Sequence, residues 1–168
     1  MCVASTADTF DLLALDSHMA VGGREQLLMV ATLQPPNPAS IARFRRCLLE
    51  RRAAVGERLL GVVLPAAPRP RLDADARRAL LELWGDLGIH LLACAIWIRR
   101  GSFIGAFQRS LVTGVLMARQ APIATGVSAT AAEAVDVLAR VEPSVDPTTR
   151  RDWTSVLERF AAEHTSLS

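Results

Sequence analysis

Apolar and polar positions alternate in blocks along this 168-residue chain, with short apolar runs separated by amphipathic stretches. A run of four to eight apolar residues bounded by turn residues is typical of a strand, and apolar residues at three- and four-residue steps are typical of a helix. This pattern predicts strands at 10–15, 26–33, 59–64, 91–98 and 122–127. It predicts helices at 39–55, 73–84, 102–119 and 130–140, and a last amphipathic helix that begins at Asp146 and Pro147.

The order of these elements defines a fold class. The turn residues at 21–24 join the first two strands by a short link, so an antiparallel hairpin is expected. A helix separates each later strand from the next, and such crossovers give parallel strands covered by helices. The sequence therefore predicts an α/β fold: a mixed, mostly parallel sheet of about five strands in the order ββαβαβαβα, with helices packed on it and an extra C-terminal helix.

The chain has the length of one ordinary domain. We assign residues 1–141 to the α/β domain and residues 142–168 to a linker and an amphipathic helix, which packs on the same domain or on a partner. A hydrophobic fraction of 51% with 21% charged residues excludes an intrinsically disordered chain.

The element order over roughly 9–140 resembles the STAS domain, the fold of anti-sigma-factor antagonists and of SpoIIAA-like proteins. The resemblance implies a regulatory domain that binds protein partners. In that family, the loop between the third strand and the second helix typically carries a serine that a kinase phosphorylates, and the added charge switches partner binding. Here the corresponding loop, 64–73, reads LPAAPRPRLD and contains neither serine nor threonine, so the switch is not carried over.

The sequence contains no recognisable catalytic constellation. Asp16, Ser17 and His18 are the three residue types of a hydrolase triad, but consecutive side chains in a strand point to opposite faces and cannot form a relay. We interpret them as a turn at a strand end. The histidines and cysteines lie far apart without metal-ligand spacing, so neither a metal nor a cofactor is expected. We therefore expect no enzymatic activity.

The cysteines and the N-terminus bear on location. The three cysteines form no disulfide framework, which fits a reducing compartment, and Cys94 lies in an apolar run typical of the core. The N-terminus has neither a basic start nor an apolar core, and the longest apolar stretches are about ten residues, too short to span a bilayer. We expect a cytoplasmic protein without a transmembrane segment.

A candidate ligand site lies where a central strand meets the predicted helix 102–119. Arg99, Arg100, Gly101 and Ser102 form this junction. The end of a parallel strand and the free N–H groups of a helix N-terminus favour an anion. This junction is the expected site for a lipid or another anionic small ligand, and the alternative is a plain turn followed by a helix cap.

Charge is distributed unevenly along the chain. Residues 38–120 carry fourteen arginines against six acidic residues, whereas the segments on either side each have a net charge of −3. A basic middle between acidic ends predicts contact with an anionic partner or with the chain's own ends.

The helix 39–55 carries candidate partner-binding residues, namely Arg43, Arg45, Arg46 and Arg52. An acidic protein or an anionic membrane surface fits this helix, whereas poor aromatic interleaving disfavours nucleic acid. The alternative is a solvated helix face.

The predicted helix 102–119 is apolar around much of its girth, and its candidate contact residues are Phe103, Phe107 and Met117. Such a helix is deeply buried or forms an interface.

The patterns together favour a non-enzymatic, STAS-like regulatory or protein-interaction module that forms a homodimer or binds a partner protein. The alternatives are a SpoIIAA-like binder of a lipid or anionic ligand at 99–103, and an enzyme of unrecognised class.

Overall fold

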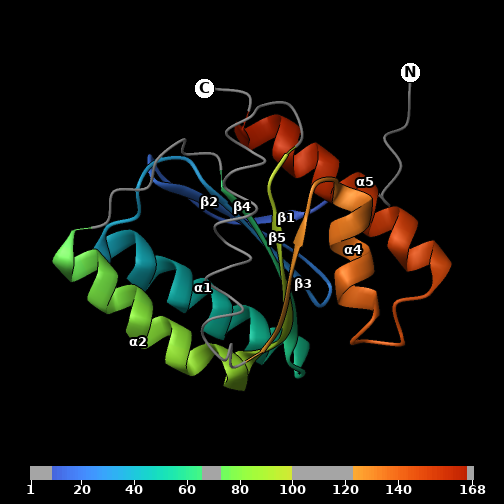
Figure 1. Cartoon of the computed structure of the whole chain (residues 1–168), viewed down its shortest axis with the longest axis horizontal. Coiled ribbons are helices and arrows are strands. Elements are labelled where there is room, and N and C mark those ends of the chain that lie inside the picture. Colours follow the sequence, from blue (N-terminus) through green and yellow to red (C-terminus); the bar gives the residue numbers. More distant parts are fainter. Residues whose placement is uncertain (1–8, 66–72, 100–122, 166–168) are drawn as a thin grey trace.

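The computed structural model describes residues 9–65, 73–99 and 123–165 (Figure 1). One six-stranded sheet forms its centre. The strands are β1 (Asp11–Leu15), β2 (Met19–Arg24), β3 (Leu27–Thr32), β4 (Leu59–Pro65), β5 (Leu91–Trp97) and β6 (Ala124–Ser128). The helices of the described part are α1 (Pro38–Val55), α2 (Ala74–His90), α4 (Ala131–Ala139) and α5 (Pro147–Thr165).

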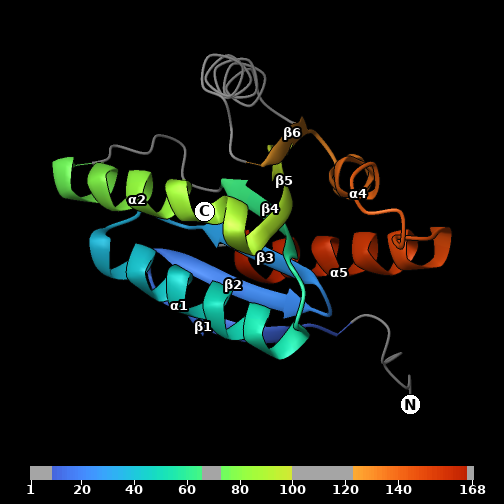
Figure 2. The same ribbon diagram turned by 90° about the horizontal axis from the view of Figure 1, so that it is seen from below.

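The strands lie in the sheet in the order in which they occur in the chain. β1, β2 and β3 pair antiparallel, and β3, β4, β5 and β6 pair parallel. Helices α1 and α2 cover one face of this sheet, while α4 and α5 cover the other (Figures 1 and 2). The structure confirms the predicted α/β fold with a mixed sheet and a C-terminal helix.

The two faces of the sheet have separate apolar clusters. In β3, Leu27 and Met29 point toward α4 and α5, whereas Leu28 and Val30 point toward α1 and α2. All four side chains are buried because successive residues of a strand point to opposite faces and both faces are covered by helices. A strand of this kind appears in the sequence as a continuous apolar run.

The segment 21–24, predicted as a turn, belongs to strand β2, so that prediction was wrong in this detail. The sheet opens with three antiparallel strands instead of one hairpin. The glycines permit close packing: a Cβ on Gly22 would lie 2.9 Å from the ring of Phe160, and one on Gly23 would lie 3.1 Å from Arg51. The turn follows at Glu25, whose φ is 50°. Glycine occurs both in turns and where another group approaches the backbone, and composition alone does not separate the two.

Both ends of helix α1 have residues that commonly cap helices. Its N-cap is Asn37, whose side chain accepts a hydrogen bond from the N–H of Ser40, and Pro38 occupies the first turn. At the other end Gly56 adopts a left-handed conformation with a φ of 81°. The helix is therefore fixed at both ends by local chemistry.

Helix α2 is longer than predicted. It begins after its N-cap Asp73, whose carboxylate accepts a backbone hydrogen bond, but it continues to His90 instead of ending near Trp84. Gly85 faces open space, and Leu87 beyond it is buried in the core. Burying a leucine side chain contributes about 2 kcal/mol, which outweighs the cost of about 1 kcal/mol for a glycine within a helix.

Helix α5 packs on the sheet of its own domain. Trp153, Val156, Leu157 and Phe160 are buried in the cluster formed with β2, β3 and α4. Phe10, just before β1, meets the ring of Phe160 edge-on at a centroid distance of 5.2 Å. The C-terminal helix thus covers β2 and β3.

Candidate functional site

The predicted anion-binding junction falls only partly within the described residues. Arg99 is exposed, and its Nη1 donates a hydrogen bond of 2.9 Å to the hydroxyl of Thr165 at the end of α5. The other residues of the junction, Arg100, Gly101 and Ser102, lie outside the described residues, as do the predicted contact residues Phe103, Phe107 and Met117. The described part of the junction therefore connects β5 to α5.

The arginines of α1 make several ion pairs within the chain. Arg43 lies 3.0 Å from the carboxylate of Asp16, and Arg51 lies 3.0 Å from that of Asp11. Arg45 pairs with Asp86 on α2. Of the two explanations that the sequence left open, contact with the chain's own acidic N-terminal part therefore holds for two of these side chains. Arg46, also predicted to bind a partner, is exposed on the same helix, whereas Arg52 is half-buried.

Asp16 organises the turn between β1 and β2. One carboxylate oxygen accepts the N–H groups of His18 and Met19 at 2.7 and 2.9 Å, and the other contacts Arg43. Burial alone would raise the pKa of Asp16, but the backbone hydrogen bonds and the guanidinium outweigh it and hold the pKa below its ordinary value. The interpretation of these residues as a strand-end turn is confirmed.

The His18 ring ties the same turn to the segment before α1. Its Nδ1 donates to the carbonyl of Pro35 at 2.8 Å, and its Nε2 accepts from the side-chain amide of Asn37 at 2.9 Å. Asn37 is in turn the N-cap of α1. Because both ring nitrogens have partners, the imidazole fixes the path of the chain into α1.

Replacing Asp16 by alanine is expected to lower the free energy of unfolding by about 1–3 kcal/mol near pH 7, because two backbone N–H groups lose their acceptor. The pKa of Asp16 is lower in the folded chain than in the unfolded one. This stabilisation is therefore present above about pH 4 and is lost as the pH falls further. Urea unfolding near pH 7 and pH 3 should show that the difference in free energy of unfolding between the wild type and Asp16→Ala is smaller at pH 3. A difference of the same size at both pH values would contradict the role of the carboxylate.

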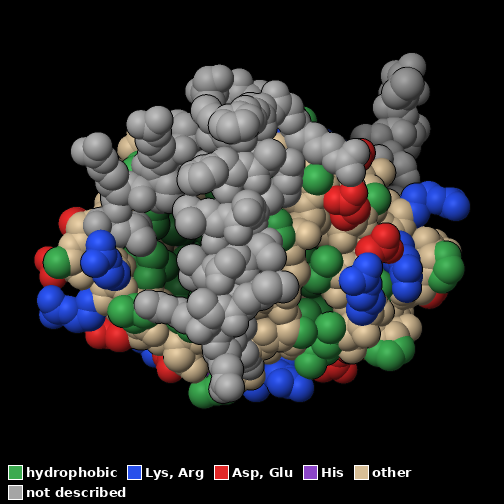
Figure 3. Space-filling model, in the orientation of Figure 1, with side chains coloured by type: hydrophobic (Ala, Val, Ile, Leu, Met, Phe, Trp, Pro, Cys, Tyr) green, Lys and Arg blue, Asp and Glu red, His purple; other side chains and the backbone are tan. Residues whose placement is uncertain are grey.

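An apolar hollow of about 220 Å³ lies between the sheet and the helices α1 and α2. Its wall is built from β2 to β5 and from both helices, and it includes Ile41, Phe44, Val63, Leu80, Cys94 and Ile96. Among the described residues of the lining, Thr32 contributes the one hydroxyl group. Figure 3 shows hydrophobic side chains gathered in a recess above α2 in that view.

The thiols near this face are not activated. Burial raises the pKa of the Cys94 thiol, in the wall of the hollow, to about 12. Burial likewise raises the pKa of Cys47. Since the thiolate is the nucleophilic form, neither thiol is a candidate nucleophile near neutral pH. The prediction that Cys94 is a core residue is confirmed, with 5% of its surface exposed.

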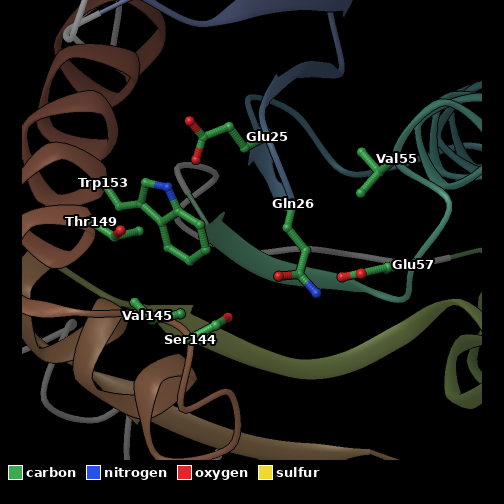
Figure 4. Close-up of a pocket in the computed structure, with 8 residues that line it drawn as sticks. All are labelled: Glu25, Gln26, Val55, Glu57, Ser144, Val145, Thr149 and Trp153. Carbon is green, nitrogen blue, oxygen red and sulfur yellow. The ribbon is translucent and has the colours of Figure 1, made fainter.

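A second cavity, of about 360 Å³, lies at the end of the sheet where the central strands β3 and β4 begin (Figure 4). We call it the Trp153 pocket. Glu25 and Gln26 come from the turn before β3, and Glu57 comes from the segment before β4. Val55 is the last residue of α1. The far side is formed by Ser144, Val145, Thr149 and Trp153, from the start of α5 and the segment before it.

The turn that supplies Glu25 is held in place by its neighbours. Arg51 Nε donates to the carbonyl of Glu25 at 3.0 Å, and the side-chain amide of Gln26 donates to the carbonyl of Arg58 at 2.6 Å. The Glu25 side chain itself is 64% exposed, and its contact of 3.9 Å with Arg24 is a weak one at the surface. The backbone of the turn is thus fixed while its carboxylate stays accessible.

Neither cavity was found from the sequence. The residues of the Trp153 pocket come from three separate segments, and those of the apolar hollow alternate with residues of the opposite face. No spacing pattern connects such residues, because the folded sheet alone brings them together. The sequence located only one part of the Trp153 pocket: the pair Asp146 and Pro147 correctly predicts the start of α5, which forms one wall.

The fold and these cavities define the chain as an α/β protein with a mixed six-stranded sheet and two chemically different pockets. Comparison with protein-family models, with curated proteins and with solved structures finds no match. Among the residues that the structure describes, no group of three or more His, Cys, Asp or Glu side chains is placed to hold a metal ion. None of the described helices has both the length and the apolar character needed to cross a membrane.

Proposed function

We propose that this chain is a non-enzymatic binding module whose ligand is an amphiphile with its alkyl chain in the apolar hollow. The observation that carries the proposal is the hollow itself, which has about 220 Å³ of space and one hydroxyl in its lining. An apolar cavity of about 150 Å³ stays dry and binds benzene, so this larger one has room for a short alkyl chain. The described residues of its lining give a charged group no partner.

The proposal retains part of what the sequence suggests. A lipid-binding, SpoIIAA-like domain is one of the expected alternatives, and the hollow gives its alkyl chain a place. The STAS-like class stays a hypothesis, since most of the loop 64–73 lies outside the described residues. The anionic headgroup site at 99–102 likewise stays a prediction.

The proposal is tested by a series of fatty acids of increasing length, measured by isothermal titration calorimetry. Each added methylene contributes about 0.8 kcal/mol when buried, so the affinity should rise about fourfold per methylene until the hollow is full. Native mass spectrometry should show one fatty acid per chain. An affinity that does not depend on chain length would contradict the proposal, as would no binding at all.

Two neighbouring leucines provide matched variants. Leu80 lines the hollow, whereas Leu81 is 51% exposed on the outer face of α2. Leu80→Trp is expected to fill the hollow and weaken fatty-acid binding at least tenfold, while Leu81→Trp should leave it unchanged. Thermal unfolding of both variants checks that they remain folded. Equal weakening by both would place the ligand elsewhere.

Self-association remains a second candidate. Helix α2 presents Leu81 and Ile89, which are 51% and 59% exposed, on either side of the open position at Gly85. Residues four positions apart lie on one helix face, so these three form an exposed apolar strip on α2. The same native mass spectra report how many subunits carry each ligand.

A further inference from the structure

The indole of Trp153 is the most unusual group in the Trp153 pocket. Only 3% of the residue is exposed, its Nε1 is buried, and no described residue accepts its hydrogen. Figure 4 shows the ring in the midst of the lining side chains, with its nitrogen on the edge that faces Glu25. A buried donor without an acceptor costs about 1–3 kcal/mol, and buried tryptophans usually have a partner for this N–H. The indole N–H of Trp153 could therefore donate a hydrogen bond to a ligand in the pocket.

The charge of the same pocket is negative. Glu25 and Glu57 contribute two carboxylates, and none of the lining residues that the structure describes is an arginine. Val55 places the C-terminal end of α1 at the wall, where the helix dipole contributes partial negative charge. Because the amide nitrogen of Gln26 is engaged with Arg58, the oxygen of this amide is a further acceptor. These groups all favour a cation.

The remaining walls are apolar. Val55 and Val145 lie on two sides of the cavity, and the indole of Trp153 adds an aromatic surface. An alkyl stem can pack on such walls, and a cation over an indole face is attracted by the electrons of the ring. The volume of about 360 Å³ falls within the range of roughly 300–1,000 Å³ for pockets that bind small ligands.

We infer that the Trp153 pocket binds an organic cation that also carries a hydrogen-bond acceptor, with the cation between Glu25 and Glu57 and the acceptor on the indole N–H. A guanidinium or ammonium group on a short alkyl stem next to an amide carbonyl has this chemistry, as in an arginine residue of a peptide. This site is separate from the apolar hollow and does not depend on the proposed function.

The indole N–H signals of an ¹⁵N-labelled sample test this inference directly. The chain has three tryptophans, so three signals are expected, and Trp153→Phe identifies the one from the pocket. Titration with Nα-acetyl-L-argininamide should shift the Trp153 signal until it saturates, and leave those of Trp84 and Trp97 in place. A Trp153 signal that does not move would overturn the inference.

Charge is tested with a matched pair of double variants. Glu25→Gln/Glu57→Gln is expected to weaken binding at least tenfold. Glu82→Gln/Glu158→Gln removes the same charge from exposed positions outside the pocket and should bind like the wild type. The single variants Glu25→Gln and Glu57→Gln, each expected to weaken binding partially, serve if the double variant does not fold. Wild-type affinity in the Glu25 and Glu57 variants would overturn the assignment of the cation.

Two further probes separate the cation from the acceptor. Nα-acetyl-L-citrullinamide has nearly the same shape without the charge and should bind at least tenfold more weakly. Butylguanidinium keeps the charge but has no carbonyl, and it should shift the Trp153 signal less and bind more weakly. Equal binding of the citrulline compound would refute the cation site, and equal binding of butylguanidinium would refute the role of the indole N–H.

Discussion

Above about pH 9, the free energy of unfolding is expected to fall by about 1.4 kcal/mol per pH unit because of one buried thiol. Burial raises the pKa of Cys94 from 9.0 to about 12 in the folded chain. Between these values the unfolded chain releases this proton while the folded chain keeps it, so rising pH draws the chain toward the unfolded state. The stabilisation is complete below pH 9 and is lost as the pH approaches 12.

The composition of the chain leaves few other side chains that titrate in this pH range. The sequence has no lysine and no tyrosine, and arginine stays charged throughout this range. Cys47, whose pKa burial also raises, adds a part of the slope. Urea unfolding at intervals from pH 8 to 11 should show a slope that Cys94→Ala largely removes and that Cys47→Ala largely retains. A slope unchanged in Cys94→Ala would contradict the buried thiol as its cause.

Removing the ring of Phe160 is expected to lower the free energy of unfolding by about 3–5 kcal/mol, since the side chain is fully buried between α5 and the sheet. Urea unfolding of Phe160→Ala measures the loss. Glu158→Ala, an exposed position on the same helix, is the control and should change stability by no more than about 0.5 kcal/mol. A loss below about 1 kcal/mol for Phe160→Ala would mean that α5 is not docked in solution.

The contact between Phe160 and Gly22 can be isolated by a double-mutant cycle. A Cβ on Gly22 would lie 2.9 Å from the ring, so Gly22→Ala alone is expected to be destabilising. In the Phe160→Ala background the ring is absent, so Gly22→Ala should lower the free energy of unfolding by clearly less. Additive effects of the two substitutions would show that the glycine is needed for another reason.

Local chemistry made much of the fold predictable. Asp73 and Thr130 cap the helices that follow them, and Gly56 ends α1, close to the positions where the sequence predicts these helices to begin or end. These signals depend on a few neighbouring residues and so survive without knowledge of the tertiary structure. The order of strands and helices follows from them together with the length of the apolar runs.

The errors arise where a distant residue decides the local structure. Gly22 lies in a strand between β1 and β3, where Phe160 from the other end of the chain packs on it, and no residue near position 22 indicates that contact. The same holds for the sites: the sequence shows a row of arginines on α1, but the pairing of Arg43 with Asp16 depends on the fold. Glu25, Glu57 and Trp153 likewise meet only after three separate segments have assembled.

The docking of α5 has a consequence for synthesis on the ribosome. The strands pair in the order in which they are made, so the sheet can grow as the chain emerges. The apolar face of β2 and β3, however, is covered by α5, which begins at Pro147, 115 residues after β3 ends at Thr32. At roughly 5–20 residues per second, that face stays bare for roughly 6 to 23 seconds of translation. During this interval the nascent chain presents Leu27 and Met29 to any chaperone at the exit tunnel.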